Sequence, residues 1–229
     1  MGKRQLSLAS MAAVSVAIGS MFATSVMAGS ASPTRSAPTP RPAAAAAAPA
    51  VTASVTAPLA SDRVLGRADA PITIIEYASF TCSHCASFTN TVLPQIKARY
   101  IDTGKAKLIF RDLPTPPVQV SQLAAAVARC AAPDRFFTVA EHLMHGQEQA
   151  FSSGEIGDWF KGAINLSGRT EQQISTCVSD PATKTAIDND TNSAVAVGVT
   201  GTPSIFVNGQ RVANPTLEGL TEALAPLVR

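Results

Sequence analysis

The stretch from Pro71 to Cys85 reads PITIIEYASFTCSHC and joins an apolar run to a pair of cysteines. Its first half is β-branched and apolar, which is typical of a buried central strand. After the cysteines, apolar residues recur with helical spacing as far as Ile101, interrupted by Pro94. We therefore expect a strand over 71–77, the cysteines at its end, and a helix kinked at the proline.

Further along the chain, a second strand is expected over 106–113 after a break at Gly104. Strand, helix and strand form a βαβ unit, so the two strands should be parallel with a right-handed crossover. From about 114 to 197 the pattern is helical throughout and is broken into four or five pieces. The segment SIFVNG then predicts a short strand and a turn at Asn208–Gly209, and a helix is expected over 217–227.

The N-terminus is typical of a secretory signal peptide over 1–28, because two basic residues precede an uncharged stretch that ends in small residues. We place the cleavage after Ala28. An uncleaved membrane anchor is the alternative, since no further charge occurs before Arg35. Residues 29–60 are almost entirely Ala, Pro, Ser and Thr, which predicts a disordered tether. One folded domain over 61–229 remains.

The composition of the chain and its expected compartment limit the functions that it can have. The net charge is only +2 and no cluster of Lys or Arg occurs, so nucleic acid is not an expected partner. Export, to the periplasm or elsewhere outside the cytoplasm, would place the four cysteines Cys82, Cys85, Cys130 and Cys177 where disulfides form and persist. The spacing of Cys82 and Cys85 alone fits a redox pair, half of a metal site or a structural disulfide.

The position of the cysteine pair at a helix N-terminus favours redox chemistry. Unpaired backbone N–H groups there stabilise a thiolate and lower the pKa of a thiol. Cys82, at the end of the helix, should be the exposed attacking thiol, and Cys85, one turn later, the buried resolving thiol. His84 between them could stabilise the Cys82 thiolate as a donor or positive charge, or it could be an exposed residue without a role.

Several motifs together carry a family resemblance. The run IIEYASFTCSHC, the helix after it, the helical insertion and the segment GTPSIFVNG resemble the DsbA-like branch of the thioredoxin superfamily over residues 62–229. The resemblance implies a thioredoxin fold of α/β class, with a mixed central sheet, the order β-α-β then β-β-α, and an all-helical subdomain inserted at about 114–197.

The resemblance also implies roles for single residues. Cys82 matches the nucleophile and Cys85 its partner, while Pro203 matches a cis-proline beside the active disulfide, preceded by Thr202. We expect the Thr202 backbone to pair with an extended substrate segment. Glu76 matches an acid that mediates proton transfer to the buried thiol. From the residues alone, Pro203 would be an ordinary trans turn and Glu76 a solvated residue.

The remaining cysteines and histidines are expected to have structural roles rather than redox or metal-binding roles. Cys130 and Cys177 share no C-x-x-C and neither clearly opens a helix, so we expect a structural disulfide that contributes roughly 4 kcal/mol. His142 and His145 could bind a metal, but no further ligands appear nearby. We therefore expect no metal, and no cofactor, because the disulfide itself carries two electrons.

The leading functional hypothesis is an exported protein thiol–disulfide oxidoreductase that donates its disulfide to substrate proteins with free cysteines. The resemblance implies reoxidation by a DsbB-type membrane protein. We expect a monomer. Thr202 also resembles the threonine of isomerases, so an isomerase or reductase remains an alternative, although the tether stands where dimeric isomerases carry a folded domain. A non-catalytic metal- or partner-binding module, without reversible dithiol chemistry, is the competing hypothesis.

Overall fold

A computed structural model of the protein describes residues 54–228; the predicted signal peptide and most of the predicted tether lie outside them. A five-stranded mixed sheet lies at the centre, with strand order β1-β3-β2-β4-β5. The parallel pairing of β2 with β3 is confirmed, and the other three pairings are antiparallel. The strands are β1 (Arg63–Leu65), β2 (Ile72–Ala78), β3 (Ala106–Asp112), β4 (Ser204–Val207) and β5 (Gln210–Arg211).

The helix that follows the cysteines is one continuous stretch with changes of winding. Two π-helical segments, η1 (Phe88–Val92) and η2 (Lys97–Ile101), flank the short α2 (Leu93–Ile96), and α1 (Ser83–Ser87) precedes them. Pro94 lies in the first turn of α2 and has no N–H to donate. The expected kink therefore takes the form of wide helical turns on both sides of the proline.

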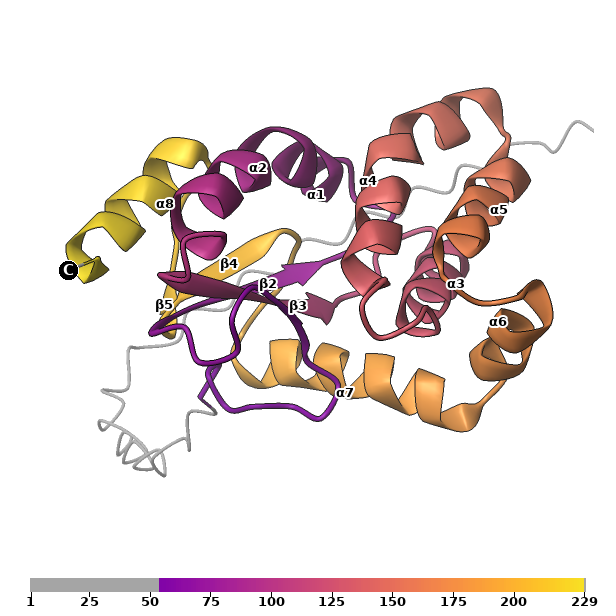
Figure 1. The fold of residues 1–229 in the computed structure, drawn as a ribbon, viewed down its shortest axis with the longest axis horizontal. Helices are drawn as coiled ribbons and strands as arrows, with labels where there is room; N and C mark the ends of the chain where they lie inside the picture. Colours follow the sequence, from indigo (N-terminus) through magenta and orange to yellow (C-terminus); the bar gives the residue numbers. More distant parts are fainter. Residues whose placement is uncertain (1–53, 229) are drawn as a thin grey trace, which may run out of the picture. The chain divides into compact units, whose positions relative to one another are not determined.

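Helices cover both faces of the sheet because side chains alternate along each strand. On one face Ile74 packs with the helical stretch 83–101 and with α8 (Leu217–Leu224), and on the other face Ile75 packs with α7 (Pro181–Ala196). Figure 1 shows these two layers above and below the strands. A 3-10 turn, η3 (Ala225–Leu227), follows α8.

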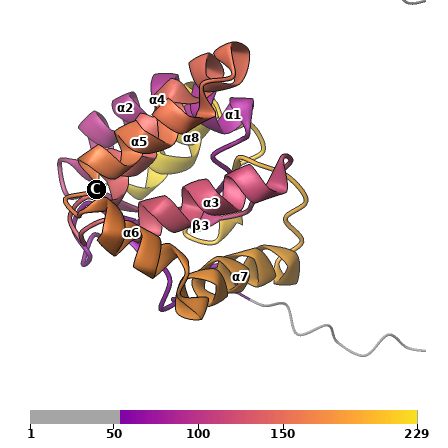
Figure 2. The same cartoon turned by 90° about the vertical axis from the view of Figure 1, so that its right-hand side faces the viewer.

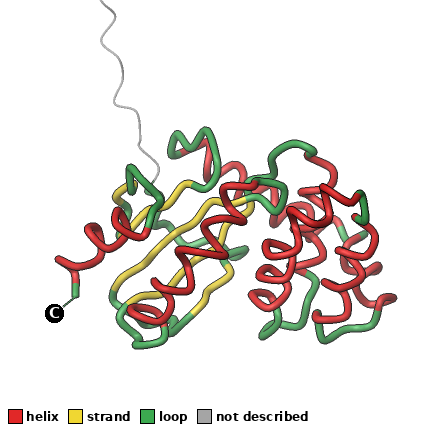
Figure 3. Tube along the Cα trace, turned by 90° about the horizontal axis from the view of Figure 1, so that it is seen from above, coloured by secondary structure: helices red, strands yellow, loops and turns green. Residues whose placement is uncertain are grey.

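The helical insertion gathers at one end of the sheet (Figure 3). Its helices are α3 (Val118–Arg129), α4 (Phe136–Ser153), α5 (Ile156–Leu166) and α6 (Glu171–Val178), with α7 continuing beneath the sheet. Seen from that end, α3 lies between the α4–α5 pair and α7 (Figure 2). The insertion and the fold class expected from the sequence are both confirmed.

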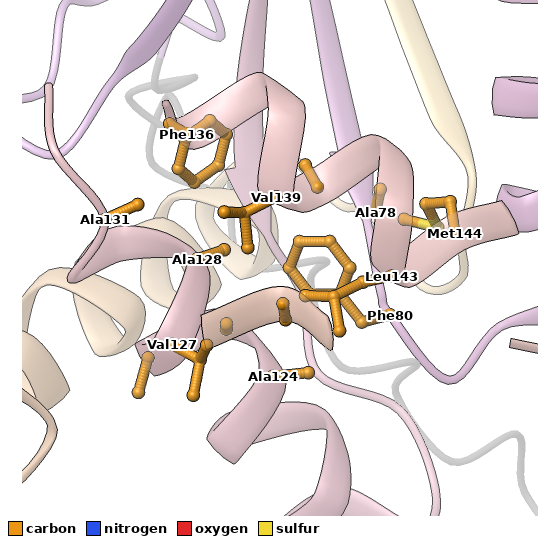
Figure 4. Packing of buried hydrophobic residues seen from close by; sticks show 14 of the residues in the cluster. Ala78, Phe80, Ala124, Val127, Ala128, Ala131, Phe136, Val139, Leu143 and Met144 are labelled. Atoms are coloured by element: carbon orange, nitrogen blue, oxygen red, sulfur yellow. The ribbon is translucent and has the colours of Figure 1, made fainter. Parts of the chain in front are cut away.

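The core of the insertion reaches the loop that carries the cysteines. Small residues of α3 let α4 approach closely, and Phe80 from the loop after β2 packs between the two helices (Figure 4). Val139 and Leu143 of α4 are fully buried in this cluster, and Cys85 belongs to it. The site therefore lies where the sheet and the insertion meet.

The packed chain begins before the expected boundary at residue 61. Val55 is buried, and Arg111 of β3 donates hydrogen bonds to the carbonyl groups of Val55 and Ala57. A buried arginine needs acceptors, and Val55 and Ala57 supply two of them, although both lie in the stretch that the sequence assigns to the tether. Edge strand β1 was likewise not expected, because three residues carry little pattern.

Among residues 54–228, no helix has both the length and the apolar character that crossing a membrane requires.

Candidate active site

The two thiols flank the first turn of α1. Cys82 is the N-cap residue with an extended backbone, its N–H bonded to Ser79 O at 3.2 Å, and its own carbonyl accepts the Ala86 N–H at 3.1 Å. Cys82 is half-buried, whereas Cys85 is fully buried one turn later. The structure thus places an accessible sulfur at the helix end and a shielded one behind it, as expected from the sequence.

The surroundings of Cys82 favour its thiolate. The hydrogen bond from the Cys85 thiol, opposed by partial burial, lowers the pKa of Cys82 to about 5, and the Thr202 side chain and the backbone N–H groups of Cys85 and His84 add to this effect. At neutral pH Cys82 is therefore mostly ionised and nucleophilic.

Cys85 has the opposite tendency. Burial raises the pKa of its thiol well above the ordinary value, the hydrogen bond to Cys82 raises it further, and so does Glu76 where that carboxyl group is ionised. Cys85 is therefore a protonated thiol, and it becomes a nucleophile only when another group accepts its proton.

Glu76 of β2 is a buried carboxyl group beside these thiols. It is 1% exposed, and its Oε1 has no hydrogen-bond partner within residues 54–228. Burial and the charge of Cys82 raise its pKa to about 8, so it is mainly protonated at neutral pH. A crevice of about 10 Å³ borders Glu76 and is lined mostly by apolar side chains, with Thr89 and Glu141 as its other polar residues.

The loop before β4 completes the site. The Thr202–Pro203 peptide bond is cis, and the Thr202 carbonyl lies 3.3 Å from Cys82 Sγ. Next to this loop opens a groove of about 490 Å³. The groove is lined by His84, Ser87, Phe88, Thr91, Val92, Thr202, Pro203, Pro215 and Thr216.

His84 lies next to Cys82 with its side chain directed to solvent. Its imidazole is exposed at the groove and forms no hydrogen bond with any residue that the structure describes, while its backbone N–H acts on Cys82. The contribution to the thiolate seen here therefore comes from the main chain of His84 rather than from its ring.

Two sets of contacts around the cysteine loop were not found from the sequence. Ser79 Oγ lies 2.7 Å from Ser121 Oγ and 2.8 Å from the Thr115 hydroxyl, which ties the loop to the start of the insertion. Gln147 of α4 donates to two carbonyl groups of the same loop. These partners are 36 to 67 residues apart in sequence, and only the polarity of Gln147 within an apolar helix face could have drawn attention to it.

The other two cysteines form a disulfide, and the other two histidines contact main-chain carbonyl groups, His145 from an exposed position on α4. Cys130 and Cys177 form a disulfide with a Cα–Cα distance of 5.8 Å. His142 Nε2 lies 3.1 Å from the Trp159 carbonyl and against Gly162, where a Cβ would approach the ring to 2.5 Å. Within the described part of the chain, no three His, Cys, Asp or Glu residues are grouped to hold a metal ion.

Taken together, the site combines a stabilised thiolate, a buried thiol three residues later and a neutral carboxylic acid. Such a set can form and break one disulfide reversibly, with the acid exchanging the proton of the buried sulfur.

Comparisons with known proteins agree with this chemistry. The family model described as Thioredoxin matches residues 59–225. A "Putative protein-disulfide oxidoreductase" of Rickettsia bellii is 31% identical over 166 residues, which is 72% of this chain and 63% of the relative. A "Probable disulfide bond formation protein D" of Bacillus cereus is 28% identical, over 70% of this chain and 76% of the relative. The chain thus spans about three fifths of the length of the Rickettsia relatives that it matches.

Solved structures show the same architecture. Alpha-DsbA1 of Wolbachia pipientis superposes with a TM-score of 0.66 at 29% identity, over 74% of this chain and 92% of that one. Oxidised BdbD of Bacillus subtilis superposes with a TM-score of 0.64 at 23% identity, over 73% and 92% of the two chains, which supports the fold alone.

Proposed function

The chain belongs to the thioredoxin family, and from this premise we propose that it is an exported thiol–disulfide oxidoreductase that donates a Cys82–Cys85 disulfide to substrate proteins. The observation that carries the proposal is the pairing of a Cys82 pKa lowered to about 5 with a buried partner thiol at Cys85. Named oxidoreductase relatives and DsbA-type structures support it.

In the first step a substrate thiolate attacks Cys82 Sγ of the oxidised protein. A substrate–Cys82 disulfide forms, the Cys82–Cys85 bond breaks, and Cys85 leaves as a thiolate. Because the Cys85 thiolate is strongly disfavoured by burial, it takes up a proton, and protonated Glu76 is the nearby donor. The groove beside Thr202 would hold the substrate segment, with the Thr202 backbone as its pairing partner.

In the second step another substrate thiolate attacks the substrate sulfur of the mixed disulfide. The substrate disulfide forms and Cys82 leaves as a thiolate, so two electrons have passed from the substrate to the protein. A DsbB-type membrane oxidant would remove them again. The predicted signal peptide and the four cysteines support an exported location.

The stabilised thiolate favours the direction of disulfide donation over reduction. Whatever stabilises the reduced form makes the disulfide a stronger oxidant, and the low pKa of Cys82 belongs to the reduced form. A reductase of the same fold would need a less stabilised thiolate.

The first experiment is the reduction potential of the purified chain, equilibrated in glutathione buffers with free thiols trapped at Cys82 and Cys85. We expect a potential more oxidising than about −150 mV, whereas a value below roughly −220 mV would identify a reductase. Absence of any reversible couple would favour the binding module instead.

A trapping experiment separates catalysis from binding. In Cys85→Ser the resolving thiol is missing, so we expect Cys82 to accumulate mixed disulfides with substrate proteins, and Cys82→Ser to accumulate none. Equal capture by both variants would argue for non-covalent binding.

A further inference from the structure

α4 belongs to the helical insertion, yet it sends one polar side chain into the cysteine loop. Among the buried residues of α4, all of which the structure describes, Gln147 alone is polar, and it is 4% exposed. A buried amide is unfavourable unless hydrogen bonds compensate for the loss of water. Its partners therefore show what the residue is placed to hold.

Both partners of Gln147 belong to the chain immediately around Cys82. Nε2 donates to the Phe80 carbonyl at 2.7 Å and to the Cys82 carbonyl at 3.2 Å. A side-chain amide nitrogen carries two hydrogens, so both can be used here at once. The two bonds hold the carbonyl groups of the two residues that flank Thr81.

The Cys82 carbonyl connects this contact to the thiolate. The same oxygen accepts the Ala86 N–H at 3.1 Å, so Gln147 holds the first acceptor of the helix. The orientation of this first turn decides where the backbone N–H groups of His84 and Cys85 point, and those groups stabilise the Cys82 thiolate. Without Gln147, neither the Phe80 nor the Cys82 carbonyl would have this anchor on α4.

We propose that Gln147 is a positioning residue for the nucleophile: from the helical insertion it holds the Phe80–Cys82 loop in the orientation in which the first turn of α1 stabilises the Cys82 sulfur. The inference rests on the proposed function of the cysteine pair. It means that the insertion takes part in tuning the nucleophile as well as covering it.

The test is Gln147→Met in the full chain, because methionine keeps the unbranched shape and removes both donors. The alkylation rate of Cys82 by iodoacetamide is measured from pH 4.5 to 8, together with the thiolate absorbance near 240 nm. We expect the rate at pH 5 to fall about fivefold, as lost hydrogen bonds of this kind predict. The difference in alkylation rate between Gln147→Met and the unsubstituted protein should vanish or change sign at pH 8, where Cys82 is ionised in both.

Two controls separate positioning from stability. Gln149→Met makes the same change on the exposed side of α4, and Val139→Ala weakens the buried core of the same helix. Val139→Ala should lower the urea midpoint without moving the titration of Cys82. Gln147→Leu provides a second variant if methionine does not fold.

An unchanged Cys82 titration in Gln147→Met or Gln147→Leu, with only a lower urea midpoint, would overturn the inference and leave Gln147 a packing residue. The proposed function fails separately, if the unsubstituted protein itself shows no reversible Cys82–Cys85 couple.

Discussion

At the scale of single residues, the pKa values of Cys82 and Cys85 are shifted in opposite directions because the two thiols lie one helical turn apart. Cys82 lies at the helix end, near main-chain N–H groups, and Cys85 lies in the apolar core. Cys82 meets the N–H groups of the first turn and the Thr202 side chain. Cys85 lies among the residues that join β2 to the insertion. The sequence could predict this division because it follows from position along a helix, whereas the protonated state of Glu76 depends on the depth at which β2 lies.

The Cys82 thiolate should make the stability of the reduced protein depend on pH. Its pKa falls from 9.0 to about 5 on folding, so its stabilisation is fully present above pH 9 and is lost as the pH falls through 5. In the oxidised protein this contribution does not exist. We therefore expect the free energy of unfolding of the reduced form to rise relative to the oxidised form between pH 5 and 9, as measured by urea titration. A pH-independent difference would contradict the low pKa of Cys82.

Glu76→Gln should slow disulfide exchange while preserving the fold. The amide has the size of the acid but cannot deliver a proton to the Cys85 thiolate, so we expect the single-turnover rate with a dithiol peptide at pH 7 to fall about tenfold or more. Glu76 has a pKa raised from 4.5 to about 8, so its contribution to stability is lost as the pH rises through 8. In Glu76→Gln the free energy of unfolding should not show this decrease as the pH rises through 8.

Glu148→Gln, on the exposed side of α4, is the matched control and should leave the rate unchanged. If Glu76→Gln exchanged disulfides as fast as the unsubstituted protein, another group would have to supply the proton.

At the scale of elements, a buried ion cluster joins β3, α3 and α7. Arg129 of α3 donates to Asp112 of β3 at 2.5 Å and to Asp190 of α7, and all three side chains are at most 2% exposed. Asp190 also accepts the Ser61 hydroxyl at 2.5 Å. Two carboxylates therefore share one guanidinium group, and burial raises the pKa of both, that of Asp190 to about 6.

Arg129→Met should destabilise the protein by about 3–5 kcal/mol at pH 7.5, because it leaves two buried carboxylates without their partner. The cost should shrink at pH 4.5. Groups whose pKa is raised in the folded state contribute stability below their unfolded pKa and lose it as the pH rises through the folded value, so protonation relieves the variant. Urea titrations of the oxidised protein at both pH values measure this.

The exposed pair Lys184–Asp188, four residues apart on α7, provides the comparison. Lys184→Met should change the free energy of unfolding by less than about 0.5 kcal/mol. A cost for Arg129→Met that is equally small, or identical at the two pH values, would mean that the buried cluster does not hold its elements together.

At the scale of the whole molecule, the elements that could be predicted from the sequence are those with a local residue pattern. β2, β3 and the insertion follow from periodicity, and the cysteine pair from its place after a strand. The contacts of Val55 and Ala57 could not be predicted, because the arginine that donates hydrogen bonds to their carbonyl groups, Arg111, lies more than 50 residues away in the sequence. The acceptors of Gln147 are equally distant. Buried polar groups with remote partners are thus the part of this site that composition does not show.

The Cys130–Cys177 disulfide should stabilise the molecule without setting the redox chemistry. It joins the end of α3 to α6, closing a separation of 47 residues. For a loop of this length the chain-entropy model gives about 4 kcal/mol, and for a domain of this size that corresponds to a melting temperature lower by about 10 °C in Cys130→Ser/Cys177→Ser. Because neither sulfur contributes to the pKa of Cys82, the glutathione equilibrium of Cys82–Cys85 should change less than about twofold. A large change in that equilibrium would show that the second disulfide tunes the first through the core that they share.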